Sequence, residues 1–479
     1  MTRHGIVGYA TYLPRHRVSL HEVGSALGIP AGGGRRVVAG FDEDSTTMGV
    51  AAAQAVLRSI GESHGAPGSV YFATTSPAYL DKTNATAIHA ALGLPSEVFA
   101  ADLAGAARSG IAALRAAAAT GGLAVLADVR VGRPASADER RGGDGAAAIL
   151  FGDPAYAIAE IVAEASATAE FLDRWRAPGD AAAEQWEERF GVEEYRPLIS
   201  EVANWALAAA DTAQADHVVL VSPNAGVVKA AARLVPGRVS TTGSPIGHAG
   251  AADAGLALAD ALDRAGTGQT ILLLSAADGC DALLLRTTGR IESGRQAEPV
   301  AAQLAAGVDV AYPTYLTWRG WLQREPPRRP EPDRPAAPPS ARMAAWKFGF
   351  TGSACRTCGF VHLPPARVCK DCGAVDQMRA RSLAGAYGTV ATYTVDRLAY
   401  SPSPPLVEAV IDFDGGGRTT LEVADAAPGD LAVGTRVGLS FRRLYSTDGV
   451  HNYFWKARVV ADPQPPAEQV RAGAGAREG

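Results

Sequence analysis

The residues best suited to chemistry are four cysteines in two closely spaced pairs. Cys355 and Cys358 form one CxxC motif, and Cys369 and Cys372 form a second after ten further residues. Each pair can present two thiolates from one tight turn, and two such turns close the tetrahedral sulfur shell of a structural zinc ion. Four unrelated core cysteines are the alternative, but four of the chain's five cysteines fall within these eighteen residues. The motif therefore predicts structural zinc, with no open coordination position for a substrate.

The composition is that of an ordinary globular protein with two or three domains. The 479 residues are 47% hydrophobic and 20% charged, with a net charge of −5. This balance gives no general attraction to nucleic acid or to an anionic membrane. The N-terminus lacks an apolar signal core, and no run approaches the ~20 apolar residues of a membrane span. Paired cysteines without a secretory signal fit a reducing compartment, so we expect a cytoplasmic location and neither nucleic-acid nor membrane partners.

Apolar periodicity predicts two halves rich in strands and helices, which suggest an internal duplication around a layered α/β core. In the first half, strands are expected at residues 5–12, 69–75, 98–103, 123–131 and 143–152, and helices at 45–59, 84–92 and 109–120. A helical, aromatic insertion (171–175 and 186–190) follows. The second half repeats the order, with helices at 201–213, 225–234 and after 247–250, and strands at 217–221, 270–275 and 282–286.

The proline-rich segment EPPRRPEPDRPAAPP at residues 325–339 is the clearest domain boundary. After the cysteines, five short alternating or β-branched runs fit a small closed barrel of OB type. They cover residues 387–395, 406–413, 419–423, 436–442 and 453–460. We predict a first half at 1–165, a second half at 166–322, a linker at 323–341, a zinc ribbon at 342–380, an OB barrel at 381–462, and a disordered tail at 463–479.

Residues 1 to about 322 resemble the thiolase superfamily, and most closely the archaeal-type hydroxymethylglutaryl-CoA synthases. The resemblance lies in GIVGY and YLPR near the start, GFDEDSTTM at residues 40–48, GCDA at 279–282 and YPTYLTWRG at 312–320. Residues 342–460 resemble the zinc-ribbon/OB-fold proteins that accompany archaeal thiolases and synthases, through CxxC-x10-CxxC, GTV at 388–390 and DGVHNY at 448–453. The resemblance implies a five-layer α/β/α/β/α domain, acyl-CoA as the ligand, and a homodimer or hetero-complex built on the central sheet.

In that superfamily a cysteine at a helix start takes the acyl group from CoA, and further polar side chains move protons and hold the oxyanion. Placed on this sequence, the cysteine falls on Ala107, the histidine on Val221 and the synthase's glutamate on Thr75. Only the last position, His248, keeps a titratable side chain. No cysteine occurs between residues 1 and 279, so an acyl-cysteine mechanism within this domain is excluded.

Several residues admit both a functional and a structural interpretation. His248 is either a surviving general base or a hydrogen-bonded buried histidine. Ser109 is a possible substitute nucleophile, but a serine at a helix start more often caps or packs. The candidate substrate-binding residues are Thr75, Ala107, Ser109, Asn224 and His248, although side chains such as those of Thr75 and Asn224 usually satisfy local backbone groups. Cys280 is expected to be a buried structural thiol.

Three functional hypotheses remain. In the favoured one, the chain is a subunit of an acyl-CoA-dependent complex that forms C–C bonds by Claisen-type condensation or C-acyl transfer. A separate thiolase-like partner supplies the cysteine, and the ribbon and barrel bind acyl-CoA. In the second, the chain is a stand-alone aldolase, retro-aldolase or acyltransferase with His248 as base. In the third, it is a non-catalytic scaffold.

Overall fold

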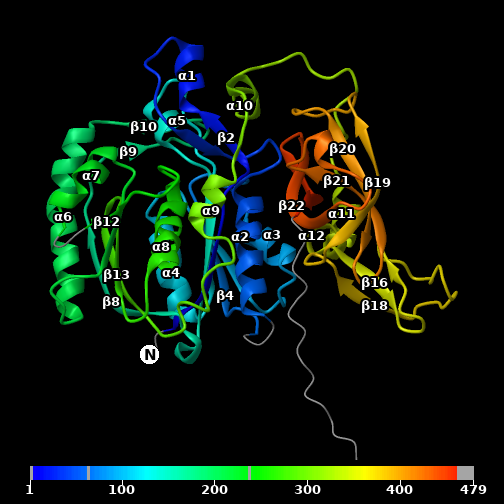
Figure 1. Cartoon of the computed structure of the whole chain (residues 1–479), viewed down its shortest axis with the longest axis horizontal. Helices are drawn as coiled ribbons and strands as arrows, with labels where there is room; N and C mark the ends of the chain where they lie inside the picture. Colours follow the sequence, from blue (N-terminus) through cyan, green and yellow to red (C-terminus); the bar gives the residue numbers. More distant parts are fainter. Residues whose placement is uncertain (1–3, 62–64, 236–238, 461–479) are drawn as a thin grey trace, which may run out of the picture.

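The computed structural model describes residues 4–61, 65–235 and 239–460. It contains a ten-stranded mixed sheet with helices on its faces, a three-stranded sheet that carries the cysteine pairs, and a closed five-stranded barrel. Figure 1 shows the large α/β domain on the left and the barrel and three-stranded sheet on the right. The predicted disordered tail lies outside the described residues. Among these residues, no helix combines the length and apolar character needed to cross a bilayer.

The ten-stranded sheet is built from two five-stranded halves with the same internal order. The first half runs β1 (Gly5–Tyr12), β7 (Gly145–Gly152), β6 (Leu123–Asp128), β4 (Ser69–Thr74) and β5 (Phe99–Ala104). The second runs β8 (Ala159–Thr168), β14 (Gly279–Thr287), β13 (Thr270–Ala276), β11 (His217–Val221) and β12 (Val239–Thr242). The halves meet where Ile6 of β1 pairs with Ala159 of β8. The matching order confirms the predicted internal duplication.

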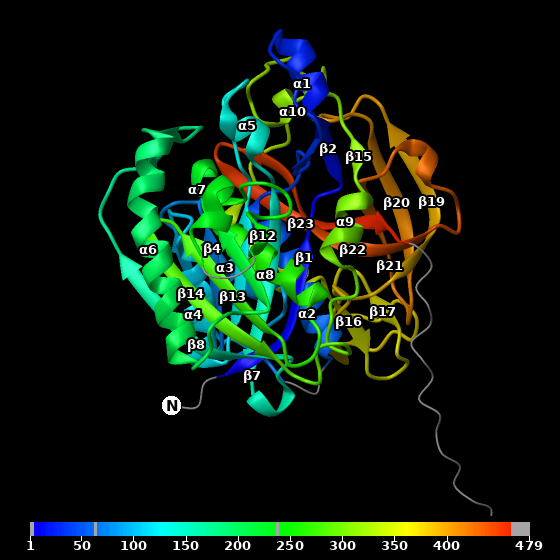
Figure 2. The same ribbon diagram turned by 60° about the vertical axis from the view of Figure 1, so that its left-hand side comes forward.

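The main helices of the two halves correspond in the same way. They are α2 (Ser45–Ile60), α3 (Ala85–Ala91) and α4 (Ser109–Thr120) in the first half, and α6 (Glu188–Ala209), α7 (Ala225–Ala230) and α8 (Asp253–Arg264) in the second. Helices α4 and α8 contact each other between the two half-sheets, while α2 with α3 and α6 with α7 cover the outer faces. Figures 1 and 2 show this sequence of five layers from two directions.

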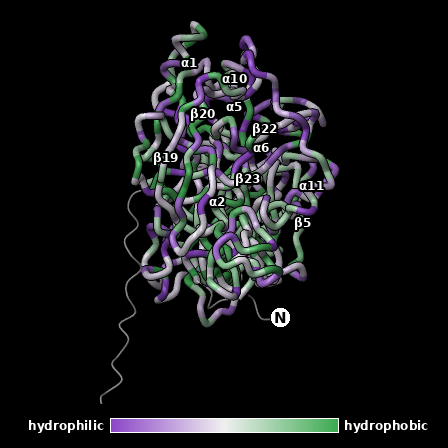
Figure 3. The backbone as a smooth tube through the Cα atoms, turned by 90° about the vertical axis from the view of Figure 1, so that its right-hand side faces the viewer, coloured by the Kyte–Doolittle hydropathy of each residue, from purple (hydrophilic) through white to green (hydrophobic). Residues whose placement is uncertain are grey.

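Sequence explains why α8 lies in the central layer. Its residues DAGLALADALDR are buried on nearly every side, from Asp253 through Ala259 and again at Ala261 and Leu262. Its apolar residues need cover from several sides, and its small alanine and glycine residues allow both half-sheets to approach closely. Figure 3 shows hydrophobic stretches of the chain gathered inside the molecule and many hydrophilic stretches at its margins.

The aromatic insertion differs from the prediction. Instead of a helix at 171–175, the chain forms a short hairpin of β9 (Arg174–Trp175) and β10 (Glu184–Gln185), whereas the predicted helical segment at 186–190 overlaps the start of α6. Helix α6 then begins at Glu188 and continues past Pro197, so it starts earlier than predicted. The sequence did not predict one continuous helix here, because a proline in a helix interior removes a hydrogen bond and usually ends the helix. Strand β8 was also missed.

The remaining elements of the first domain lie mostly at the top of this domain in Figure 1. They include β2 (His16–Ser19), β3 (Arg35–Val38) and β15 (Val308–Asp309) in one small sheet, with α1 (Leu20–Leu27), α5 (Ala137–Arg141), α9 (Val300–Ala305) and α10 (Tyr312–Trp318). Asp144 is buried and binds Arg36 and Arg319. Both guanidinium groups lie over the Tyr315 ring. This network ties α10 to the loop between β6 and β7.

The barrel has the predicted strands in the order β19-β20-β21-β23-β22. They are β19 (Gly388–Asp396), β20 (Leu406–Phe413), β21 (Arg418–Ala424), β22 (Arg436–Thr447) and β23 (Val450–Val459). Trp455, Phe441 and Tyr453 pack inside it. Before the barrel come α11 (Ala337–Arg342), α12 (Ala344–Gly349) and the three-stranded sheet β16 (Thr351–Cys355), β17 (Val361–His362) and β18 (Met378–Ser382).

A buried network of charged side chains joins the barrel to the first domain. Arg442 of β22 lies 2.6 Å from Glu43 and 3.4 Å from Asp42, both just before α2. It also lies 2.7 Å from Asp425 of the barrel. Lys456 of β23 contacts Asp42 at 2.9 Å. Charged groups removed from water need partners, and this network supplies them across the interface.

Candidate functional site

His248 is fixed in position by its backbone and by a carboxylate. It follows Gly247, whose positive φ of 88° suits glycine, and its N–H donates to the Arg141 carbonyl at 2.8 Å. Its Nδ1 lies 2.6 Å from Oδ2 of Asp253, the first residue of α8. The other Asp253 oxygen accepts from the Ala249 N–H at 2.6 Å. This leaves the Nε2 of His248 as the ring nitrogen available to a substrate.

His248 and Asp253 line a cavity of about 260 Å³. Polar and cationic side chains contribute to the same walls, including Ser222, Ser244, Arg174, Asp138 and Lys229. Arg174, on the β9–β10 hairpin, forms an ion pair with Asp138. Burial raises the pKa of Asp138, but Arg174 and the nearby Arg130 outweigh that effect and lower it. The cavity therefore places the His248 imidazole among charged side chains of both signs.

Thr75, placed at the synthase's glutamate position, lies in a closed hydrogen-bond network. Its hydroxyl donates to Asp128 Oδ1 at 3.0 Å and accepts from Arg130 Nη1 at 2.9 Å. Asp128 also accepts from the Thr75 N–H, the Ser76 hydroxyl and the Ala251 N–H. Thr75 does not line the His248 cavity. Asp128 and Arg130 were not predicted from the sequence; the available signal was a carboxylate at the end of the apolar strand LAVLAD.

The start of α4 meets the loop that carries His248. Gly110 packs so closely on this loop that a β-carbon there would lie 2.1 Å from the Ala251 carbonyl oxygen. Ala107 occupies the turn before α4, as predicted, and offers only a methyl group. Ser109 lines a different depression of about 450 Å³, together with Arg108 and other residues, and does not line the His248 cavity.

Asn224 caps α7 and has no free hydrogen-bonding group. Its Oδ1 accepts from the N–H groups of Gly226 and Val227, and its Nδ2 donates to Asp173 and to the Glu188 carbonyl. An amide has two donors and two acceptor sites, so this side chain is saturated. Burial raises the pKa of Asp173, a residue that the sequence analysis missed.

Two further residues singled out in the sequence, Val221 and Cys280, are buried. Val221, at the end of β11, is 2% exposed and belongs to the core between the half-sheets. Cys280 is fully buried on β14, where burial strongly raises the pKa of its thiol. A thiolate is the nucleophilic form of cysteine, so this environment makes Cys280 unreactive.

The four paired cysteines come together as a candidate metal centre. Their sulfurs all lie within 4.8 Å of one another, with Cys355 and Cys372 3.7 Å apart and Cys358 and Cys369 3.5 Å apart. A zinc ion with Zn–S bonds of about 2.3 Å places its sulfurs about 3.8 Å apart, whereas a disulfide requires about 2.05 Å. Backbone N–H groups, chiefly that of Cys358, lower the pKa of Cys355 to about 6. Geometry and donor set fit a tetrahedral metal ion.

Comparisons with known proteins agree with this architecture. About two thirds of the chain is similar to the hydroxymethylglutaryl-CoA synthases of Methanopyrus kandleri (30% identical over 336 residues, 65% of this chain and 95% of the relative) and Archaeoglobus fulgidus (29% over 338 residues, 66% and 98%). The family "ChsH2, C-terminal OB-fold domain" matches residues 381–442.

Solved structures show the same fold. An HMG-CoA synthase complexed with CoA aligns with a TM-score of 0.55 at 14% identity, covering 68% of this chain and 92% of that chain. The HMG synthase of the curacin biosynthetic pathway aligns with a TM-score of 0.54 at 18% identity, covering 67% and 88%. The five layers and the duplicated half-sheets define a thiolase-superfamily domain. Within that superfamily, the chain belongs to the hydroxymethylglutaryl-CoA synthase family, with an OB-fold domain of the ChsH2 type at its C-terminal side.

Proposed function

We propose that this chain binds acyl-CoA thioesters and performs proton transfer in a C–C bond-forming or bond-breaking step, with His248 as the base and without an acyl-cysteine. The observation that carries this proposal is the 2.6 Å contact between His248 and Asp253 at the wall of a cavity. A carboxylate on Nδ1 fixes the ring's tautomer and stabilises the imidazolium that forms when Nε2 accepts a proton. This is the stand-alone hypothesis of the sequence analysis.

The chemistry is an aldol-type step. Nε2 of His248 removes a proton from the carbon next to the thioester carbonyl, and the electron pair moves onto the carbonyl oxygen as an enolate. Arg174 and Lys229, which line the same cavity, offer positive charge to the developing oxyanion. The enolate carbon then attacks a second carbonyl, and the proton on His248 passes to the new alkoxide. The reverse sequence is a retro-aldol cleavage.

Deuterium exchange tests this role without knowledge of the second substrate. The full-length protein is incubated with acetyl-CoA or acetoacetyl-CoA in D₂O, and loss of the α-proton signal is followed by NMR. We expect His248→Gln to slow exchange by about 100-fold or more, the usual scale for a general base, and His89→Gln to leave it unchanged. Equal exchange by both variants, or an acyl adduct at Ser109 or Cys280 in intact-mass spectra, would contradict the proposal.

A second candidate is the subunit hypothesis, in which a separate thiolase-like protein supplies the acyl-cysteine. The absence of cysteine from residues 1–279 favours it, because the family's condensation starts from an acylated cysteine. In that case the ribbon and barrel bind the acyl-CoA. His248 then either contributes to the partner's reaction or has no catalytic role. Condensation that appears only when a thiolase-like protein is mixed with this chain, and that survives His248→Gln, would favour this candidate over the first.

A further inference from the structure

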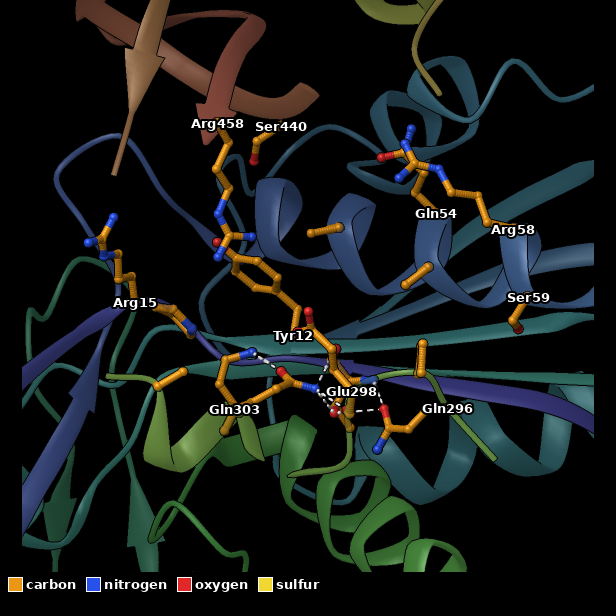
Figure 4. Close-up of a pocket in the computed structure, with 18 of the residues that line it drawn as sticks. Tyr12, Arg15, Gln54, Arg58, Ser59, Gln296, Glu298, Gln303, Ser440 and Arg458 are labelled. Atoms are coloured by element: carbon orange, nitrogen blue, oxygen red, sulfur yellow. Dashed lines mark hydrogen bonds between the residues drawn. The ribbon is translucent and has the colours of Figure 1, made fainter. Parts of the chain in front are cut away.

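A second cavity, of about 610 Å³, lies between the two domains. The first domain contributes β1, α2 and the segment 296–306, and the barrel contributes residues of β22 and β23 (Figure 4). None of its lining residues belongs to the His248 cavity. Its volume falls within the range of about 300–1,000 Å³ that is typical of small-molecule sites. Because both domains form its walls, the cavity exists only while they are docked.

Three arginines from three different elements line this cavity, against one acidic residue, Glu298. Arg15 follows β1, Arg58 lies on α2, and Arg458 lies on β23. Figure 4 shows Arg458 reaching toward the Tyr12 ring, with Arg58 and Gln54 farther along α2. The guanidinium of Arg458 lies 5.9 Å from the centre of that ring. Cationic groups thus face the cavity from both domains.

Two of these arginines have carboxylate partners but remain partly exposed. Arg458 lies 3.4 Å from Asp425 and its side chain is 39% exposed; Asp425 also contacts Arg442, which has Glu43 as a further partner. Arg15 lies 3.7 Å from Asp430, and both side chains are about one-third or more exposed, which weakens the pair.

Arg58 has no carboxylate within ion-pair distance in the described part of the chain. Its Nη2 donates to the Ala384 carbonyl at 3.2 Å. Surrounding protein lowers its pKa by desolvation, yet the side chain remains accessible from the cavity. Arg58 is an exposed cation on the cavity wall without a carboxylate partner among the described residues, so an anion in the cavity would be stabilised by it.

We propose that this interdomain cavity binds a phosphate ester, with Arg458 and Arg58 as its principal anion-binding residues. The planar fork of arginine matches phosphate oxygens, and such charge-assisted hydrogen bonds are stronger than neutral ones. Hydrogen-bonding side chains (Gln54, Ser59, Ser440) and apolar side chains (Ala51, Ala55, Leu439, Val459) complete the walls, so the ligand is an organic ester rather than a bare ion. The ester is either a free nucleotide or the adenosine-phosphate part of a coenzyme.

This site is independent of the His248 chemistry. Since a ligand held by both domains binds the docked arrangement and not the separated one, it stabilises docking by mass action. A ligand at 100 times its dissociation constant would add about 2.7 kcal/mol, which corresponds to a factor of about 100 in the docking equilibrium.

Calorimetric titration of the full chain tests the proposal, with adenosine 5′-monophosphate, coenzyme A and uncharged adenosine as probes. We expect adenosine 5′-monophosphate, coenzyme A or both to bind, and adenosine to bind at least tenfold more weakly. Arg58→Gln and Arg458→Gln should each weaken binding by about 10- to 100-fold, the range for one charged hydrogen bond. The control Arg379→Gln, on the exposed strand β18, should leave it unchanged.

The outcomes separate the possible sources of the ligand. Binding of both phosphate-bearing probes identifies a general nucleotide site, and binding of coenzyme A alone identifies a coenzyme site; in either case sensitivity to Arg58→Gln is required. Three results would overturn the proposal: no binding of either phosphate-bearing probe at millimolar concentration, equal binding of adenosine, or binding that neither arginine variant weakens. Arg58→Gln keeps the test valid if Arg458→Gln disturbs docking, because Arg58 lies outside the buried ion network and its one bond to the Ala384 carbonyl is duplicated by Gln54.

Discussion

The Nη1 of Arg442, on barrel strand β22, lies 2.6 Å from the carboxylate of Glu43, just before helix α2 of the synthase-like domain. Both side chains are 1% exposed. Glu43 also accepts a hydrogen bond from the Tyr12 hydroxyl at 2.5 Å, and Arg442 donates to that hydroxyl at 2.9 Å. The two domains are therefore joined by a buried charged cluster whose members depend on one another.

Removing the central cation should separate or unfold the barrel. Arg442→Met leaves Asp42, Glu43 and Asp425 buried without their shared partner, and breaking a buried ion pair from one side typically costs about 3–5 kcal/mol. Urea unfolding should show this loss. The control Arg418→Met, which removes an exposed pair with Asp412, should change the unfolding free energy by less than about 0.5 kcal/mol. Equal effects of the two substitutions would mean that the buried cluster does not hold the domains together.

Acid should weaken the same interface. Burial raises the pKa of Asp425, but Arg442 and Arg458 outweigh it and lower the pKa from 3.8 to about 2. Because the pKa is lower in the folded state, the ionised Asp425 stabilises the fold fully above about pH 4. This stabilisation, about 2–3 kcal/mol, is lost as the pH falls toward 2. Glu43 acts in the opposite sense, because burial raises its pKa.

Unfolding free energies measured from pH 5 to 2.5 would check this dependence. The variant Asp425→Asn should lose stability at pH 5 and show a shallower fall with pH than the unmodified chain. Asp412→Asn, at the barrel surface, should leave the slope nearly unchanged. A fall of the same steepness in all three proteins would assign the acid sensitivity to other groups.

Asp253 should matter for proton transfer through His248 and not by contact with substrate. Asp253→Asn keeps the side chain's size but removes the charge that stabilises the imidazolium. We expect α-proton exchange to fall by about 10- to 100-fold and its pH profile to shift, with little change in thioester affinity. A purely structural role would instead lower the melting temperature without moving the pH profile of the remaining activity.

The cysteine cluster should hold one zinc ion per chain. Cys358→Ser or Cys372→Ser should abolish stoichiometric zinc in elemental analysis, whereas Cys280→Ser should retain it. Metal removal should unfold the three-stranded sheet first, because ligand binding and folding of such sites are coupled. It should also loosen the barrel, since Val361 and Leu363 of the ribbon share a hydrophobic cluster with barrel residues. Stoichiometric zinc in the Cys358→Ser variant would contradict the assignment.

We expect edge strand β5 to take part in dimerisation. Among the described residues it is the last strand of the first half-sheet, and Phe99 on it is 59% exposed. An exposed apolar edge strand is prone to pair with another chain. We expect the protein to sediment as a dimer and Phe99→Asp to shift it toward monomer. Leu398→Asp, at an exposed barrel position, should have no effect; a monomeric unmodified chain would contradict the expectation.

Local patterns were sufficient for most of the fold. The strand at 5–12 matches β1 because a short apolar run bounded by glycine and proline allows few alternatives, and the acidic segment before Ser45 caps α2 through Asp44. The hairpin at 174–185 could not be foreseen. Its two-residue strands are too short for periodicity to show, and its ion pairs, Arg174 with Asp138 and Arg133 with Glu184, join segments about 40 to 50 residues apart.

The candidate site was less predictable for the same reason. His248 was found from a family resemblance, but its partner Asp253 reads in the sequence as an ordinary acidic residue at a helix start. Asp128 and Arg130 become significant only when β4 and β6 lie side by side and bring them to Thr75. Such relationships depend on long-range contacts, which no local pattern encodes.

The proline-rich segment that joins the two domains makes their docking a unimolecular event. Arg329 in this segment pairs with Asp396 at 2.7 Å, and the Thr447 hydroxyl donates to the Pro332 carbonyl, so the segment follows the barrel surface. Tethering of this kind corresponds to millimolar effective concentrations, which makes docking insensitive to dilution. Cleavage within residues 325–335 would turn the same contacts into a bimolecular equilibrium, and the chain would then behave as a complex that falls apart as it is diluted.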